Sequence, residues 1–124
     1  MKTVLIVEDH ADIRRLIRMT LELEDCEILE APDAAVGLEM ISRVRPHVVF
    51  LDWMMPGGSS GLDICHAVKS DPALAAVKVV LVSARGSSAD REAGLRAGAD
   101  EYFVKPFSPI ELLACVTDVA GEPQ

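Results

Sequence analysis

Short apolar runs recur along the whole chain, and each is rich in β-branched or aromatic side chains. They lie at residues 4–7, 27–30, 48–51, 79–82 and 102–104. Most of these runs are continuous rather than alternating, which is typical of strands buried on both faces of a parallel sheet. We therefore predict five short strands.

Apolar residues at helical spacing fill the segments between these runs. Ile13, Leu16, Ile17 and Leu21 follow the i, i+3, i+4, i+8 stripe of an amphipathic helix. Further helices are predicted around residues 38–44, 62–68, 88–97 and 112–119. The order of strand then helix, repeated five times, predicts an α/β fold with a parallel sheet and helices on both of its faces.

Residues suited to helix ends support these boundaries. Asp33 and Ser108 are candidate N-caps, and Pro109 suits the first position of the last helix. Gly98 and Gly121 stand where helices commonly stop in a left-handed conformation. The helix that begins after Ser108 therefore has the clearest predicted start in the chain.

The length of 124 residues corresponds to one ordinary domain. We assign residues 1–120 to this domain and residues 121–124 to a tail or to the start of a linker. Met1 favours a native start, and the chain is either a stand-alone protein or part of a longer one. The first apolar run is too short for a signal peptide or a membrane span, so a cytoplasmic location is expected.

The charge balance limits the partners that the domain can bind. A formal net charge of −8 argues against nucleic-acid binding and against docking on anionic lipid, which both need clustered cations. The cysteines Cys26, Cys65 and Cys115 lack metal-site spacing. Their apolar surroundings predict buried free thiols in a reducing compartment.

Polar residues follow four of the five predicted strands. Glu8 and Asp9 come after the first strand, Asp52 after the third, Ser83 after the fourth and Lys105 after the fifth. In open parallel sheets, ligands bind at the carboxyl ends of the strands. The sequence therefore predicts that three carboxylates, a hydroxyl and an ammonium group meet at one edge of the sheet.

This set of groups favours a hard divalent cation. Three neighbouring carboxylates repel one another, and the single ammonium group offsets only one of their charges. Mg²⁺ with oxygen ligands fits the remaining deficit better than zinc does. A magnesium ion and a lysine beside a carboxylate would stabilise a transferring phosphoryl group, and the carboxylate itself can be the nucleophile.

At these strand ends the sequence resembles a receiver domain of a bacterial two-component response regulator, similar to the chemotaxis regulators. The resemblance covers essentially the whole chain. Its motifs are Val7-Glu8-Asp9, Leu51-Asp52-Trp53-Met54-Met55-Pro56, Val82-Ser83-Ala84 and residues 98–107. It implies a doubly wound, flavodoxin-like (βα)5 fold whose parallel strands lie in the order 2-1-3-4-5.

The resemblance also implies roles for individual residues. Asp52 would accept the phosphoryl group. Asp9 would ligate Mg²⁺ directly, Glu8 directly or through water, and Met54 through its backbone carbonyl, with Mn²⁺ able to replace Mg²⁺. The side chain of Lys105 would contact the phosphoryl oxygens, and the Lys105–Pro106 peptide would be cis.

Two further residues would form the switch. Ser83 would hydrogen-bond the phosphoryl group after transfer, and Tyr102 would rotate inward behind it. The affected surface would comprise the fourth helix, the fifth strand and the fifth helix. The domain would then be a signalling switch that catalyses only its own phosphorylation and dephosphorylation.

The resemblance implies protein partners. The phosphoryl donor would be a sensor histidine kinase or a phosphotransfer protein. The receiving partner would be a downstream protein or an output domain beyond this chain. Neither nucleic acid nor a membrane would be bound directly, and the domain would be a monomer or a phosphorylation-dependent dimer.

One feature departs from the family pattern, which usually has a glycine eight residues after the acceptor aspartate. Here Ser60 holds that position and Gly61 follows. The loop after the third strand therefore looks one residue longer, which affects its conformation and partner fit. Asp52 and Met54 lie upstream of the change.

Other interpretations remain open. A phosphorylation-independent binding module could use the same face. A flavodoxin-like cofactor binder or hydrolase is less favoured, since the chain has no glycine-rich phosphate loop and no recognisable Ser–His pair. His10, His47 and His66 show no ligand spacing, and we interpret His10 as a loop residue near the acidic pair and Trp53 as a packing residue.

Overall fold

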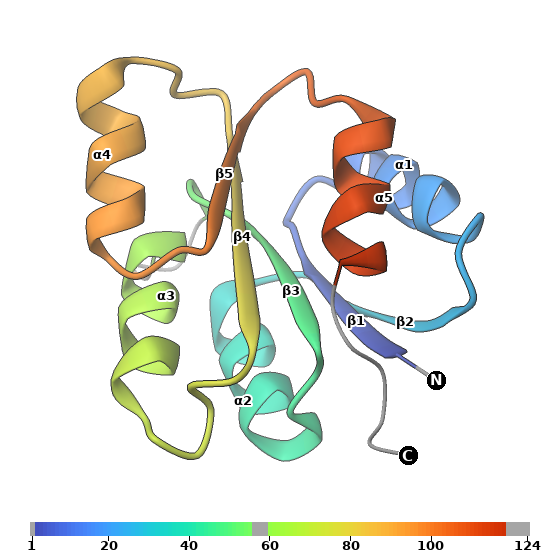
Figure 1. Ribbon diagram of the computed structural model, residues 1–124, viewed down its shortest axis with the longest axis horizontal. Coiled ribbons are helices and arrows are strands. Elements are labelled where there is room, and N and C mark those ends of the chain that lie inside the picture. The colour runs from blue at the N-terminus through green and yellow to red at the C-terminus, as the bar shows by residue number, and fades with distance from the viewer. Residues whose placement is uncertain (1, 56–59, 119–124) are drawn as a thin grey trace.

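The structure is a computed structural model that describes residues 2–55 and 60–118. Strands and helices alternate throughout, as Figure 1 shows. The strands are β1 (Lys2–Val7), β2 (Cys26–Ala31), β3 (Val48–Asp52), β4 (Lys78–Ser83) and β5 (Glu101–Val104). The helices are α1 (Ala11–Leu21), α2 (Ala34–Val44), α3 (Gly61–Ser70), α4 (Ser88–Arg96) and α5 (Pro109–Thr117).

The strands form one parallel sheet in the order β2-β1-β3-β4-β5. This confirms the predicted (βα)5 fold and its 2-1-3-4-5 order. Helices α2, α3 and α4 pack on one face of the sheet, and α1 and α5 pack on the other (Figure 1). The order reverses direction at β1 and β3, and in such sheets ligands bind beside that reversal.

The continuous apolar runs supply both faces of the sheet. Along β1, Val4 and Ile6 join the core beneath α1 and α5, while Leu5 and Val7 join the core beneath α2, α3 and α4. Every residue of β3 is buried. Because successive strand side chains point to opposite faces, a strand covered on both sides must be apolar at consecutive positions.

The helix ends confirm most of the capping predictions. The side chains of Asp33 and Ser108 accept hydrogen bonds from the first turns of α2 and α5, and Pro109 occupies the first turn of α5. Gly98 has a φ of 108°, the left-handed conformation expected after α4. Gly121 lies outside the described residues, as does the predicted tail.

All three cysteines are free, as the sequence predicted. Cys65 and Cys115 are buried, and Cys26 is half-buried. Burial raises the pKa of Cys65 to about 11 and that of Cys115 to about 12. These two thiols therefore stay protonated and contribute as packing groups. Among the described residues, no helix combines the length and the apolar character that crossing a membrane requires.

The loop that departs from the family pattern lies partly outside the described residues, at 56–59. Where the description resumes, Gly61 opens α3 and its N–H donates to the carbonyl of Trp53 over 2.8 Å. A Cβ on Gly61 would lie 2.5 Å from the carbonyl oxygen of Asp52 and 2.9 Å from the Cα of Trp53. The end of β3 and the start of α3 can approach this closely only because residue 61 has no side chain.

We expect Gly61→Ala to lower the free energy of unfolding by about 1–3 kcal/mol, because the added methyl group meets backbone atoms that cannot move aside. Urea unfolding followed by circular dichroism measures this change. Gly86→Ala is the matched control, because a Cβ there meets side-chain atoms of the exposed Val104, the nearest at 3.1 Å, and no backbone atom among its three nearest neighbours. Equal stability of the two variants would contradict the close approach at Gly61.

Candidate functional site

The predicted site residues meet at the carboxyl ends of the strands. Glu8 and Asp9 follow β1, Asp52 ends β3, Ser83 ends β4 and Lys105 follows β5. Asp52 is in register with Val82, and the N–H of Lys105 donates to the carbonyl of Ser83 over 2.8 Å. The sheet register therefore brings together groups that lie up to 97 positions apart in the chain.

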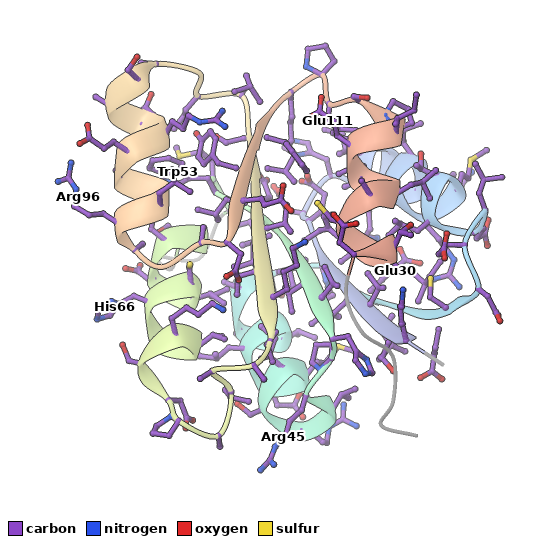
Figure 2. All side chains as sticks on the ribbon, in the orientation of Figure 1. Glu30, Arg45, Trp53, His66, Arg96 and Glu111 are labelled. Carbon is purple, nitrogen blue, oxygen red and sulfur yellow. The ribbon has the colours of Figure 1, made fainter. Side chains whose placement is uncertain are left out.

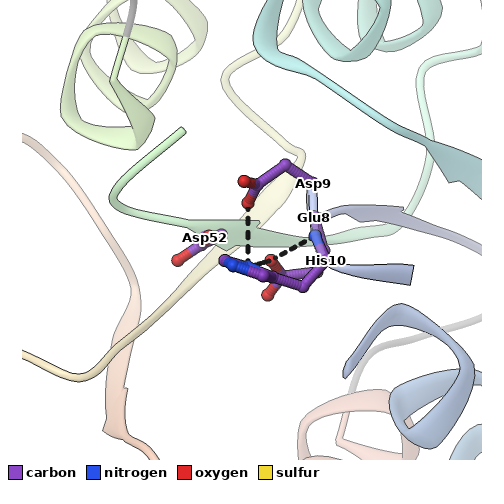
Figure 3. A group of neighbouring side chains, drawn as sticks. All are labelled: Glu8, Asp9, His10 and Asp52. Atoms are coloured by element: carbon purple, nitrogen blue, oxygen red, sulfur yellow. Dashed lines mark hydrogen bonds and ion pairs between the residues drawn. The ribbon is translucent and has the colours of Figure 1, made fainter. Parts of the chain in front are cut away.

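The acidic part of this site is largely buried. Glu8 is 1% exposed and Asp52 is 5% exposed. One oxygen each from Glu8, Asp9 and Asp52, with a ring nitrogen of His10, lie within 4.8 Å of one another (Figure 3). We call these four residues the acidic pocket. So many carboxylates in a small, poorly hydrated volume repel one another and favour a bound cation.

Lys105 supplies the positive charge on the far side of this pocket. Its Nζ lies 2.9 Å from Oε1 of Glu8 and 3.4 Å from Oδ1 of Asp52. Burial alone would lower the pKa of Lys105, but the hydrogen bond to Glu8 and the charge of Asp52 outweigh it and raise the pKa. Lys105 therefore stays an ammonium group that holds the two buried carboxylates in place.

The pKa values of two carboxyl groups in the pocket shift in opposite directions. Burial, with the neighbouring Glu8, raises the pKa of Asp52 from 3.8 to about 7. The pKa of Asp9 is lowered, because hydrogen bonding to Glu8 and Asp52 outweighs the effect of its own burial. Pairs of acidic groups with opposed shifts are typical of functional sites.

The oxygen atoms of the pocket fit a hard divalent cation. Oδ1 of Asp9 is buried and is the one side-chain oxygen or nitrogen, among the buried atoms of residues 2–55 and 60–118, without a hydrogen-bond partner. An unpartnered buried carboxylate oxygen is costly unless a cation binds it. Carboxylate oxygens are the ligands that Mg²⁺ prefers, so the donor set supports the magnesium site predicted from the sequence.

The raised pKa of Asp52 predicts an unusual pH dependence. A carboxyl group whose pKa is higher in the folded state contributes stability at low pH and loses it as the pH rises from 3.8 through about 7. Without divalent cations, Asp52→Asn should therefore become more stable than the wild type above that range, by roughly 2–4 kcal/mol. Chemical unfolding with a chelator across this pH range measures the difference.

Magnesium is the control for this pH prediction. Adding Mg²⁺ should stabilise the wild type above pH 7 and shrink its difference from Asp52→Asn, because the cation offsets the buried charge. If the wild-type stability instead rises with pH relative to the variant, the Asp52 carboxylate is not destabilised by burial.

Ser83 and Tyr102 lie beside the pocket as a connected pair. Ser83 is fully buried, and its Oγ accepts a hydrogen bond from the backbone N–H of Arg85 over 3.0 Å. The hydroxyl of Tyr102 donates to the backbone carbonyl of Arg85. Tyr102 is 1% exposed, so its ring already occupies an inward position. One short loop thus joins the site to β5.

Arg85 also lies beside the site, although the sequence analysis did not single it out. Its guanidinium lies 4.9 Å from the ring centroid of Trp53 and pairs with Asp90 at 3.1 Å. Trp53 is 7% exposed and makes an edge-to-face contact with Tyr102, as a packing residue would. No sequence pattern indicates that Arg85 lies over Trp53, the residue after Asp52; this contact is seen only in the structure.

The remaining predicted ligand is Met54. It follows Asp52 by two positions, and its side chain is 56% exposed. The side chain meets Arg85, with Sδ of Met54 3.8 Å from the guanidinium. Its backbone carbonyl stays a predicted metal ligand.

The structure changes the interpretation of His10. Its Nδ1 lies 3.2 Å from Oε2 of Glu8 and 3.3 Å from Oδ1 of Asp9. The hydrogen bond to Glu8 and the charges of Asp9 and Glu8 raise the pKa of His10. His10 therefore belongs to the acidic pocket rather than to an unrelated loop. Its position immediately after the acidic pair was the only sequence signal.

Comparison with known proteins shows which family the chain resembles. The family described as the response regulator receiver domain matches residues 4–117. The phosphate regulon transcriptional regulatory protein PhoB of Pseudomonas aeruginosa is 39% identical over 113 residues, covering 91% of this chain and 49% of that protein. The transcriptional regulatory protein ResD of Bacillus subtilis is 37% identical, covering 89% and 44%. The chain thus spans about half the length of these curated relatives.

Solved structures agree with these sequence matches. The receiver domain of the Francisella response regulator 1452 is similar with a TM-score of 0.87 and 28% identity, over 95% of each chain. The chemotaxis protein CheY4 of Vibrio cholerae has a TM-score of 0.85 and 28% identity, over 97% of this chain and 99% of its own. Both matches favour the receiver interpretation over a cofactor binder of similar fold.

Proposed function

Because the chain belongs to the response regulator receiver domains of two-component systems, we propose that it is switched by a phosphoryl group on Asp52. The observation that carries this proposal is the acidic pocket itself. A buried carboxylate at the end of β3 faces two further acids on one side and an ammonium group on the other. Such a carboxylate can act as a nucleophile toward a phosphoryl donor.

The proposed reaction transfers a phosphoryl group from a phosphohistidine to Asp52. A carboxylate oxygen of Asp52 forms the new P–O bond as the P–N bond breaks, and the bonding electrons return to the imidazole of the donor. Asp52 must be ionised to attack, and because burial raises its pKa to about 7, a nearby cation would favour the reactive form. Asp9, Glu8, Asp52 and the backbone carbonyl of Met54 would hold Mg²⁺, which would supply that positive charge when bound.

Lys105 completes the charge balance. Glu8, Asp9 and a phosphoryl group together carry about −4, against +3 from a divalent cation and Lys105. The ammonium group already contacts Oδ1 of Asp52, so it is placed to follow the charge onto the phosphoryl oxygens. Both cations are needed to bring the phosphorylated site close to neutrality.

The switch runs through Ser83. Its hydroxyl now accepts from the N–H of Arg85, which leaves its own O–H free to donate to a phosphoryl oxygen. One charge-assisted hydrogen bond contributes about 1.5–3 kcal/mol, enough to shift a two-state equilibrium by about 10- to 150-fold. Movement of Ser83 would disturb the loop that holds the hydroxyl of Tyr102.

The surface that responds comprises α4, β5 and α5. Tyr102 belongs to β5 and lines an open groove on this surface together with Arg91, Val104, Phe107 and Glu111, among others. A change in the position of Tyr102 would therefore alter a groove that a partner can read. The domain would therefore act as a signalling switch. The only reactions that it catalyses would be its own phosphorylation and dephosphorylation.

The proposed partners follow from the family. The donor is a sensor histidine kinase or a phosphotransfer protein, and the acceptor of the signal is a downstream protein or an output domain. The relatives PhoB and ResD are transcriptional regulatory proteins about twice as long as the matched region. We retain from the sequence a cytoplasmic location, a monomer or phosphorylation-dependent dimer, and a domain at residues 1–120 that does not itself bind nucleic acid.

Beryllofluoride, which mimics a phosphoryl group on a carboxylate, tests this function without a partner. With Mg²⁺ present it should change the fluorescence of Trp53, which adjoins Asp52 and contacts Tyr102. Asp52→Asn should abolish the change, whereas Asp33→Asn, a substitution at the half-buried N-cap of α2, should keep it. A wild-type protein that gives no response would favour a phosphorylation-independent binding module.

A further inference from the structure

The side chain of His10 has turned into the acidic pocket. His10 occupies the N-cap position of α1, yet its side chain makes no capping hydrogen bond to that helix. Its Nδ1 lies instead 3.2 Å from Oε2 of Glu8 and 3.3 Å from Oδ1 of Asp9 (Figure 3). The ring is 64% exposed, so it stands at the solvent side of the pocket.

Neither of the two oxygens that flank this nitrogen is bound by Lys105. Lys105 binds Oε1 of Glu8, whereas Oε2 accepts a hydrogen bond from the backbone N–H of His10 over 3.1 Å and also faces the imidazole. Oδ1 of Asp9 is buried without a hydrogen-bond partner. A cation placed between these atoms would meet two carboxylate oxygens and one ring nitrogen, and Asp52 offers a third oxygen within the same 4.8 Å group.

A nitrogen donor changes which cation such a pocket prefers. Mg²⁺ takes oxygen ligands and keeps several waters, so an imidazole adds little to its binding. Transition-metal ions such as Co²⁺ and Zn²⁺ bind imidazole strongly, and Zn²⁺ commonly has four protein ligands of mixed nitrogen and oxygen type.

We propose that His10 is a ligand for transition-metal ions in the acidic pocket, so that Zn²⁺ and Co²⁺ bind there through the imidazole as well as the carboxylates. Mg²⁺ uses only the oxygen atoms of the same pocket. This inference rests on the proposed function, because it assumes that the pocket holds a divalent cation. His10 would thus give the pocket a preference for transition-metal ions that the carboxylates alone would not provide.

Isothermal titration calorimetry with Mg²⁺, Zn²⁺ and Co²⁺ tests the assignment at mildly alkaline pH. His10→Gln should weaken the binding of Zn²⁺ and Co²⁺ by about 10- to 100-fold. Removing a residue that only hydrogen-bonds to a metal ligand typically has an effect of this size, and removing a ligand itself should have at least the same effect. The binding of Mg²⁺ should change by less than about twofold, since magnesium seldom uses nitrogen ligands. The visible absorption of bound Co²⁺ should also shift when its nitrogen ligand is removed.

His66→Gln is the matched control. His66 is an exposed histidine on α3 that points away from the sheet, so its loss should leave all three affinities unchanged (Figure 2). Unchanged Zn²⁺ binding in His10→Gln would overturn the proposal. Equal weakening of Mg²⁺ and Zn²⁺ would overturn it too, because His10 would then act on the shape or charge of the pocket.

The magnesium titration separates this inference from the function on which it rests. If the wild type binds no Mg²⁺, the proposed phosphoryl switch fails, whatever His10 does. If the wild type binds Mg²⁺ and its Zn²⁺ affinity does not depend on His10, the switch stands and only the choice of metal is overturned.

Discussion

Asp52→Asn is expected to remove phosphoryl uptake completely. The amide has the size of the carboxylate but lacks the negative oxygen that attacks phosphorus, so no acyl phosphate can form at this position. Incubation with acetyl phosphate and Mg²⁺, followed by intact-mass measurement, should show one added phosphoryl group on the wild type and none on the variant.

Two features make this substitution a sharp test. Loss of a buried charge from the crowded pocket should stabilise the folded protein above pH 7, so misfolding would not explain a negative result. Asp33→Asn makes the same chemical change at the N-cap of α2, where asparagine serves equally well, and should leave phosphorylation intact. A phosphoryl mass on Asp52→Asn would show that another group is the acceptor.

Lys105→Ala has the second largest expected effect. It removes the ammonium group that contacts Glu8 and Asp52, so the negative charge that builds on the phosphoryl oxygens is no longer offset on that side. Loss of one such group typically slows a transfer step by about 10²- to 10³-fold. We expect a slowdown of about 10²-fold, measured as the rate at which the phosphoryl mass appears during incubation with acetyl phosphate and Mg²⁺.

Metal binding should survive the same substitution. Lys105 contacts Oε1 of Glu8 and Oδ1 of Asp52, whereas Oδ1 of Asp9 has no hydrogen-bond partner, so Mg²⁺ affinity should be largely intact. Any phosphorylated Lys105→Ala should fail to produce the spectroscopic change at Trp53, since the signal is uncoupled from the site. The control is Lys78→Ala, a half-buried lysine paired with Glu101 at the opposite end of β4. Loss of Mg²⁺ binding in Lys105→Ala alone would contradict this geometry.

The sequence predicted the fold well because local patterns and strand burial point to the same answer. The continuous run Val48–Leu51 could be buried on both faces only in the middle of a covered sheet, and it became β3. Ser108 and Pro109 predicted the start of α5 from local backbone chemistry alone. The convergence of Glu8, Asp52 and Lys105 followed from the rule that parallel strands end at one edge.

Other parts of the site depend on side-chain directions that the sequence does not contain. His10 could have capped α1, and only its rotation toward Glu8 and Asp9 places it in the pocket. Arg85 looked like an ordinary loop residue until the fold placed it over Trp53. The shifted glycine at position 61 was visible in the sequence, but its reason, the close approach to the Asp52 carbonyl, needed the structure.

Chemical trapping of the phosphorylated residue tests the central claim most directly. Borohydride reduces an aspartyl phosphate to homoserine, which peptide mass spectrometry can place in the chain. After treatment with a phosphohistidine donor, we predict homoserine at position 52, and only when Mg²⁺ is present. Homoserine at another aspartate, or at position 52 to the same extent in a chelator, would contradict the account.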